Sequence, residues 1–122
     1  MDEEARSGGF VARNLADGER TTFPNGAVDA VAIAGVTVKR ATMRPGWEWE
    51  RDESPLVGTD SCPNAHLLSV VAGRLGCRLD DGTEHELGPG DVAAVPPGHV
   101  GRTIGDEDLV YLDFDAGVDP SV

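Results

Sequence analysis

The stretch Gly88–Gly101, GPGDVAAVPPGHVG, decides the fold that the sequence predicts. Its first half carries an apolar run that predicts a strand at 91–95. Pro97 and Gly98 fit the two central positions of a type II turn, because proline presets the first φ and glycine allows the positive second one. The stretch therefore predicts a strand, a tight turn and the start of another strand, with His99 directly after the turn.

Outward from this stretch, turn signals recur about every eight to twelve residues, a spacing typical of an all-β sandwich or barrel. The clearest strand is RLGCRL at 74–79, where apolar and polar residues alternate. Asp81-Gly82 then predicts a hairpin, with TEHEL at 83–87 as the returning strand. The segment 65–73 is apolar on both faces and is expected to be a central strand covered on both sides. Further strands are expected at 28–34, 36–43, 91–95, 99–104 and 109–115, with little helix.

The length of 122 residues suits one domain, expected at 9–122 after a flexible tail at 1–8. The formal net charge is −12, and a field of this sign disfavours nucleic acid and anionic membrane surfaces as partners. The first residues, MDEEARSGG, lack the apolar segment of a secretory signal, so a cytoplasmic location is expected. Cys62 and Cys77 are then expected as free thiols, Cys77 as a small buried side chain on the apolar face of its strand.

The order of these elements resembles the cupin superfamily, whose members are small jelly-roll barrels. The most specific piece is GPGDVAAVPPGH, which is similar to the second cupin motif in Gly90, Pro96 and Gly98. MRPGWEW at 43–49 resembles the strand and turn before the first motif, and VVAGRL at 70–75 resembles the strand that ends it. The resemblance implies an all-β barrel, a double-stranded β-helix of two antiparallel sheets around a central cavity.

The resemblance covers about residues 21–115 and implies a divalent metal in the cavity. The family's usual ligands are two histidines in a His-x-His pattern, a glutamate shortly after them, and a histidine in the second motif. Counting back from Gly73, the position of the glutamate is His66. The positions of the two histidines fall on Asp60 and Cys62, so each of these places departs from the family pattern.

Two further positions bear on the ligand set. A count forward from Pro45-Gly46 places the first ligand near Asp52 instead. In the second motif the ligand position is Gly101, which has no side chain to bind a metal. By strand alternation His99 shares the inward face with Gly101, about 6–7 Å nearer the mouth, and its imidazole can lean into the space that the glycine leaves.

The chemistry of these candidates indicates which metal they suit. A thiolate from Cys62 with the imidazoles of His66 and His99 suits tetrahedral Zn²⁺. Two histidines with a carboxylate from Asp52 or Asp60 suit Fe(II) in a facial triad. Manganese and nickel are further options, and a barrel without a metal stays open.

Other candidate residues each allow more than one role. Trp47 and Trp49 share one face and either cover a flat apolar ligand or pack in the core or a dimer interface. Glu50 and Asp52 belong to an acidic run that is either a solvated loop or the source of an acid–base group. His85 lies between two glutamates and is expected to be a solvated hairpin residue.

These patterns lead to one functional hypothesis and two alternatives. The first is a metal-dependent cupin that acts on a small apolar or aromatic molecule in its cavity, by isomerisation, cyclisation or oxygenation. The second is a non-catalytic binding or sensor module, with or without a metal. The third is a structural dimeric partner of another protein. A homodimer is expected in each case.

Overall fold

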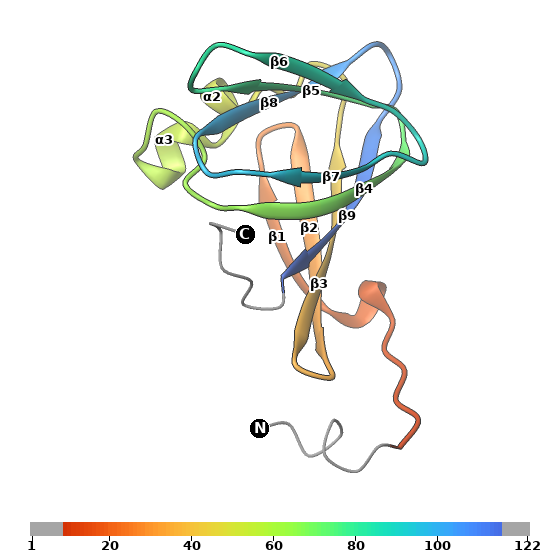
Figure 1. Cartoon of the computed structure of the whole chain (residues 1–122). Helices are drawn as coiled ribbons and strands as arrows, with labels where there is room; N and C mark the ends of the chain where they lie inside the picture. The colour runs from red at the N-terminus through yellow and green to blue at the C-terminus, as the bar shows by residue number, and fades with distance from the viewer. Residues whose placement is uncertain (1–8, 116–122) are drawn as a thin grey trace.

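The computed structural model describes residues 9–115 as two antiparallel β-sheets with three short helical segments (Figure 1). The strands are β1 (Glu19–Phe23), β2 (Gly26–Ile33), β3 (Val36–Met43), β4 (His66–Ala72), β5 (Arg74–Leu79), β6 (Glu84–Leu87), β7 (Val92–Val95), β8 (His99–Ile104) and β9 (Leu109–Asp115). The helical segments are η1 (Leu15–Asp17), α2 (Trp49–Asp52) and α3 (Ser54–Val57). The tail expected at 1–8 lies outside the described residues.

The two sheets form the two layers of a barrel. One has six strands in the order β1-β2-β3-β9-β4-β7, and the other has three in the order β6-β5-β8, which form the upper layer in Figure 1. The all-β class is therefore confirmed. The hairpin expected at Asp81-Gly82 is confirmed too, with β5 and β6 as its two paired strands. Within residues 9–115 no helix is long and apolar enough to cross a membrane.

The core lies between the sheets, where alternate residues of each strand point inward. On β5 the inward residues Leu75 and Cys77 are buried, as the alternation predicts. The three most deeply buried large side chains are Met43, Val70 and Leu109, one each from β3, β4 and β9. These three strands are neighbours in the large sheet, so its best-packed part lies at β3, β9 and β4.

The turn between β7 and β8 has the predicted conformation. Gly98 has φ of +85°, the positive value that the second central residue of a type II turn requires. His99 then opens β8 and is buried, and it pairs with Leu79 of β5. The turn thus fixes the direction in which the His99 side chain points.

Two elements differ from expectation. β1 was not expected, because nearly all of its residues are exposed and show no apolar alternation. The acidic segment expected as a solvated loop forms α2 and α3 instead. Asp52 stabilises α2 by accepting a hydrogen bond from the backbone N–H of Glu48 at 3.0 Å, and Gly58 ends α3 with φ of +85°.

The outer face of β4 is also not covered, contrary to prediction. Leu67 and Val71 remain 45% and 52% exposed, and Val92 on the neighbouring β7 is 68% exposed. An apolar pattern on both faces predicts burial on both faces, but the six-stranded sheet has only one covered side. The homodimer stays a prediction.

The space next to Gly101 is filled by Trp47. A Cβ atom at Gly101 would lie 3.0 Å from Cη2 and 3.2 Å from Cζ3 of the indole ring. Trp47 is held there because its carbonyl accepts a hydrogen bond from the backbone N–H of Thr103, at 3.0 Å. The expectation that His99 leans into this space is therefore wrong, because the tryptophan occupies it.

We expect Gly101→Ala to lower the free energy of unfolding by about 1–3 kcal/mol, because the new methyl group overpacks against a large, fixed ring. The measurement is urea denaturation followed by circular dichroism. Gly76→Ala is the matched control, since its Cβ would meet Cδ1 of Ile104 and Cγ and Nε of Arg102, which belong to flexible side chains and not to a fixed ring. If Gly101→Ala were as stable as the wild type, the Trp47 ring would leave room for a methyl group at position 101, contrary to this account.

Candidate metal centre

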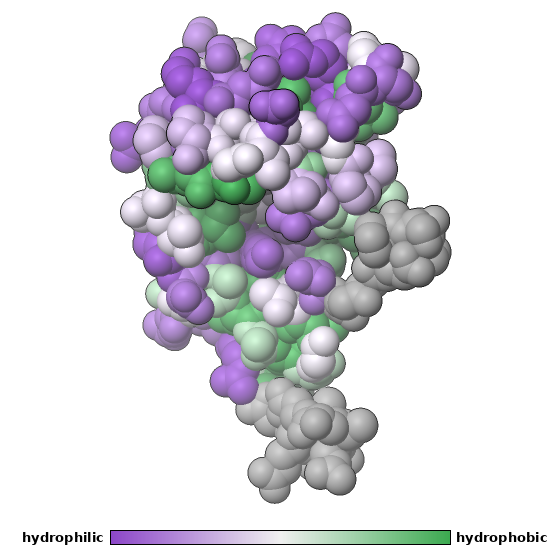
Figure 2. Space-filling model, turned by 90° about the vertical axis from the view of Figure 1, so that its left-hand side faces the viewer, coloured by the Kyte–Doolittle hydropathy of each residue, from purple (hydrophilic) through white to green (hydrophobic). Residues whose placement is uncertain are grey.

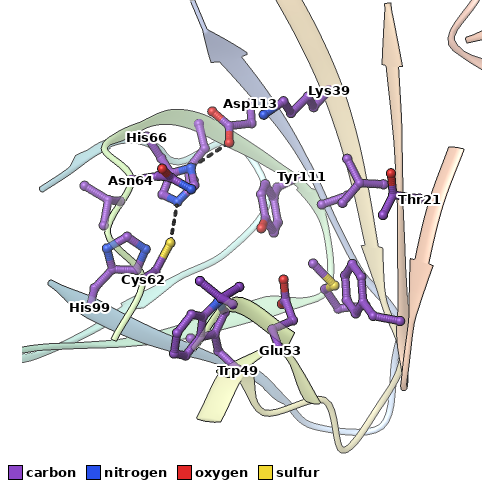
Figure 3. A pocket seen from close by; sticks show the side chains of 18 of the residues that line it. Thr21, Lys39, Trp49, Glu53, Cys62, Asn64, His66, His99, Tyr111 and Asp113 are labelled. Atoms are coloured by element: carbon purple, nitrogen blue, oxygen red, sulfur yellow. Dashed lines mark hydrogen bonds and ion pairs between the residues drawn. The ribbon is translucent and has the colours of Figure 1, made fainter. Parts of the chain in front are cut away.

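Cys62 and His66, four residues apart, converge with the distant His99 at one end of the cavity (Figure 3). One ligand atom from each lies within 4.8 Å of the others. The Sγ of Cys62 is 3.6 Å from Nε2 of His66, and the two imidazoles meet edge to face with centroids 4.9 Å apart. The structure therefore brings together three of the four residues expected as ligands.

Backbone hydrogen bonds hold this group together. The N–H of Cys62 donates to the carbonyl of His99 at 2.7 Å, and the N–H of Gly98 donates to the carbonyl of Cys62 at 2.8 Å. Cys62 is thereby bridged to the start of β8, although Pro63 separates it from β4. His66 opens β4, so the three side chains come from three chain segments that meet at one end of the barrel.

Each histidine has one ring nitrogen engaged with a hydrogen-bond acceptor. Nδ1 of His66 donates to Oδ2 of Asp113 at 2.6 Å, and Nδ1 of His99 donates to the carbonyl of Pro96 at 2.7 Å. Carboxylate and carbonyl oxygens can only accept here, so Nδ1 carries the hydrogen in both rings. The neutral rings then offer the Nε2 lone pair, which is how metal-binding histidines are commonly oriented.

Asp113 was not identified from the sequence. It faces inward from β9, in register with Leu68 of β4 and Lys39 of β3. The segment LVYLDF is apolar on both faces, so alternation did not mark this position as internal. The one available signal was a carboxylate inside an otherwise apolar strand.

The charges of Cys62 and His66 are linked. Burial raises the pKa of Cys62, but hydrogen bonds with His66 and His99 outweigh it and lower the pKa to about 6. Burial lowers the pKa of His66, but Asp113 and Cys62 outweigh it and raise the pKa to about 9. Without a metal, the pair is therefore a thiolate and an imidazolium at neutral pH.

The group opens into a cavity of about 590 Å³. Trp47 and Trp49 are both buried and line it, as do Leu56 and Val57 of α3. Leu56 and Val57 are largely exposed, and Figure 2 shows apolar side chains gathered on the side of the molecule where α3 lies. The cavity is thus mainly apolar, with a polar end at Cys62, His66 and His99 and further polar side chains from β1 and β3.

Other candidate residues lie elsewhere. Asp60 is exposed and is not part of the three-residue group. Glu50 pairs with Arg78 at 3.0 Å on the outside of the barrel. Asp52 is buried but does not line the cavity, and its hydrogen bond with Arg51 holds its pKa below the usual range. His85 is exposed on β6, as expected.

Glu53 is a cavity residue that sequence reasoning missed. Its Oε2 accepts a hydrogen bond from Nε1 of Trp47 at 3.0 Å, and its side chain lines the cavity. Burial raises its pKa to about 7, although the hydrogen bond from Trp47 acts in the opposite direction. The acidic run suggested a solvated loop, and only the two short helices reveal which of its carboxylates turns inward.

No family model matches this sequence, and no curated protein matches it. Several solved structures are similar to this chain. Oxalate decarboxylase from Bacillus subtilis is 25% identical with a TM-score of 0.60, over 84% of this chain and 28% of that one. A cupin-like protein from Thermotoga maritima is 21% identical with a TM-score of 0.58, over 83% and 78% of the two chains. The polyketide cyclase RemF from Streptomyces resistomycificus is 16% identical with a TM-score of 0.61, over 87% and 78%.

These similarities extend over most of the chain, although the chain spans only 28% of the length of oxalate decarboxylase. They agree with the all-β architecture of two antiparallel sheets. This chain therefore has the same fold as these cupin and cupin-like structures.

Proposed function

We propose that this protein is a metal-dependent cupin that binds Zn²⁺ through Sγ of Cys62 and Nε2 of His66 and His99. The convergence of these three donor atoms within 4.8 Å carries the proposal. With Zn–S near 2.3 Å and Zn–N near 2.0 Å, a tetrahedral ion separates its sulfur and nitrogen ligands by about 3.6 Å. The distance between Sγ of Cys62 and Nε2 of His66 is 3.6 Å, which fits.

The donor set also favours zinc over the other candidate metals. One thiolate and two imidazoles suit Zn²⁺, whereas manganese prefers oxygen ligands and Fe(II) sites of the facial-triad type need a carboxylate. Asp52 and Asp60, the two carboxylates considered for that role, are not part of the group. Three protein ligands leave one tetrahedral position open, which is typical of catalytic zinc rather than structural zinc.

The open position would face an apolar cavity that suits a small apolar or aromatic molecule. Bound zinc supplies Lewis acidity, drawing electron density from a carbonyl or water oxygen. The chain's own residues orient the site: Asp113 and the Pro96 carbonyl fix the two imidazoles, while Trp47 and Trp49 exclude water and offer flat surfaces. The decarboxylase and cyclase among the similar structures support an enzymatic role.

The metal content of protein purified without a histidine tag tests the proposal. We expect about one equivalent of zinc in the wild type and less than about a tenth in Cys62→Ser, His66→Ala and His99→Ala, because each change removes one of three ligands. Elemental analysis measures this, and His85→Ala is the control that should keep its zinc. A wild type that neither contains nor takes up a transition metal would leave the non-catalytic binding module as the better account.

The hydrogen bond from His66 to Asp113 predicts a second effect. We expect Asp113→Asn to weaken zinc binding by about 10–100-fold, because the amide cannot raise the basicity of the imidazole as the carboxylate does. Competition with a fluorescent zinc chelator measures the affinity. Asp108→Asn removes the same charge from the exposed turn before β9 and should bind as the wild type does. If Asp113→Asn bound zinc as tightly as the wild type, Asp113 would not contribute to zinc binding.

The pKa of Cys62 predicts its reactivity in the metal-free protein. Alkylation by iodoacetamide requires the thiolate, so its rate should be half-maximal near pH 6, high above that pH and lost below it. Peptide mass spectrometry separates Cys62 from Cys77, whose pKa burial raises and which therefore reacts slowly. Saturating zinc should suppress the reaction of Cys62. A midpoint above about pH 8, close to that of an ordinary thiol, would contradict the charge pair.

A further inference from the structure

We propose that Glu53 is the general base of this cavity, and that the substrate is a flat, apolar carbonyl compound from which Glu53 removes a proton at the carbon next to the carbonyl group. This inference rests on the proposed zinc site, which would receive the carbonyl oxygen. It goes further by assigning the substrate class and the residue that moves the proton.

The position of Glu53 is set by the two short helices. Glu53 is the residue between α2 and α3, and in Figure 3 its carboxylate points into the cavity that also holds Cys62 and His66. Within residues 9–115 its side chain has one hydrogen-bond partner, Nε1 of Trp47, which donates to Oε2. The other oxygen, Oε1, is left available to a bound molecule.

The remaining carboxylates of the cavity are not available for this role. Asp113 is engaged with His66 at 2.6 Å, and Glu19 lies exposed on β1 at the edge of the sheet. Asp52 and Glu50 do not line the cavity. Among the described residues that line the cavity, Glu53 is therefore the carboxylate that is partly buried and is not already paired with a histidine.

The surroundings of Glu53 support proton transfer near neutral pH. Burial raises its pKa to about 7; the charges of Cys62 and Asp52 add to this, while the hydrogen bond from Trp47 and the charge of His66 oppose it. Tyr111, a further ionisable group in the cavity, stays neutral because burial raises its pKa far above the usual value. In the metal-free protein both forms of the Glu53 carboxyl group are then populated at pH 7, which suits a residue that must accept a proton and return it.

The shape of the cavity supports the substrate class. The end of the cavity with Cys62, His66 and His99 is polar, and Lys39 of β3 adds a cation to the lining, whereas Trp47, Trp49, Leu56 and Val57 provide flat and apolar walls near Glu53. A volume of about 590 Å³ lies within the range of sites that enclose small organic molecules. A molecule with an aromatic ring and a carbonyl group matches the walls with its ring and the polar end with its oxygen.

The proposed step is balanced without an oxidant or reductant. The carboxylate oxygen of Glu53 forms a bond to hydrogen as the C–H bond next to the carbonyl breaks. The electrons of that bond form a C=C bond, and the carbonyl π electrons move to the oxygen. If the protonated Glu53 exchanges its proton with solvent and then protonates the same carbon, a solvent hydrogen enters the substrate; if it returns the proton to another carbon, an isomer forms.

Acetophenone in D₂O is a probe for this step, because NMR reports the replacement of its methyl hydrogens by deuterium. We expect zinc-loaded wild type to accelerate the exchange over buffer, and Glu53→Gln to lose about 100-fold or more of the acceleration. Glu107→Gln, a change at an exposed loop residue, is the control that should exchange as the wild type does. Acetophenone binding, followed by quenching of tryptophan fluorescence, should persist in Glu53→Gln.

A second measurement does not depend on activity. In metal-free protein labelled with ¹³C-glutamate, one carboxyl resonance should titrate near pH 7, and it should be missing from Glu53→Gln. Trp47→Phe removes the indole donor that favours the carboxylate, so it should move this midpoint to higher pH. If Trp47→Phe fails to fold, the comparison of wild type with Glu53→Gln still identifies the resonance.

The outcomes separate the two proposals. A zinc-loaded wild type that does not accelerate exchange, or a Glu53→Gln variant that exchanges as fast as the wild type, overturns the role of Glu53 and leaves the metal site intact. A protein that takes up no metal overturns the proposed function, whatever Glu53 does. A midpoint near 4.5 for every glutamate would also overturn the inference.

Discussion

Two backbone hydrogen bonds between Cys62 and the turn before β8 hold the candidate site together. They run from Cys62 to the carbonyl of His99 and from Gly98 to the carbonyl of Cys62, at 2.7 and 2.8 Å. They require the positive φ of Gly98, which no β-branched or bulky residue adopts without strain. Because these bonds involve backbone atoms, the thiol of Cys62 and the imidazole of His99 stay close whatever their protonation states.

The site departs from the usual cupin pattern, and the departures compensate one another. The usual ligand position of the second motif is Gly101, and the ring of Trp47 occupies the space beside it. His99 supplies an imidazole two residues earlier on the same strand, and Cys62 approaches it from outside the sheet. With the donors at one end of the barrel, apolar side chains line much of the remaining cavity, and Glu53 and Lys39 add polar groups to it.

Much of the fold could be predicted from the sequence because strand alternation and glycine turns are local signals. The convergence of Cys62, His66 and His99 could be predicted only through the resemblance to cupins, because Pro63 interrupts the strand pattern between Cys62 and His66. Asp113 and Glu53 could not. Asp113 sits in a strand that is apolar on both faces, and Glu53 is turned inward by helices too short to show a helical period. The strand pattern also gave one wrong prediction, that β4 is covered on both faces. Its outer apolar residues are exposed, because an apolar pattern alone does not show what covers a face.

The central claim is that a thiolate and two imidazoles of this chain bind one metal ion. X-ray absorption spectroscopy at the zinc K-edge of the loaded protein tests it most directly, because sulfur and nitrogen ligands differ in distance. The account predicts one sulfur at about 2.3 Å with nitrogen or oxygen ligands at about 2.0 Å, and loss of the sulfur shell in Cys62→Ser. A wild-type spectrum with nitrogen and oxygen ligands alone would contradict it.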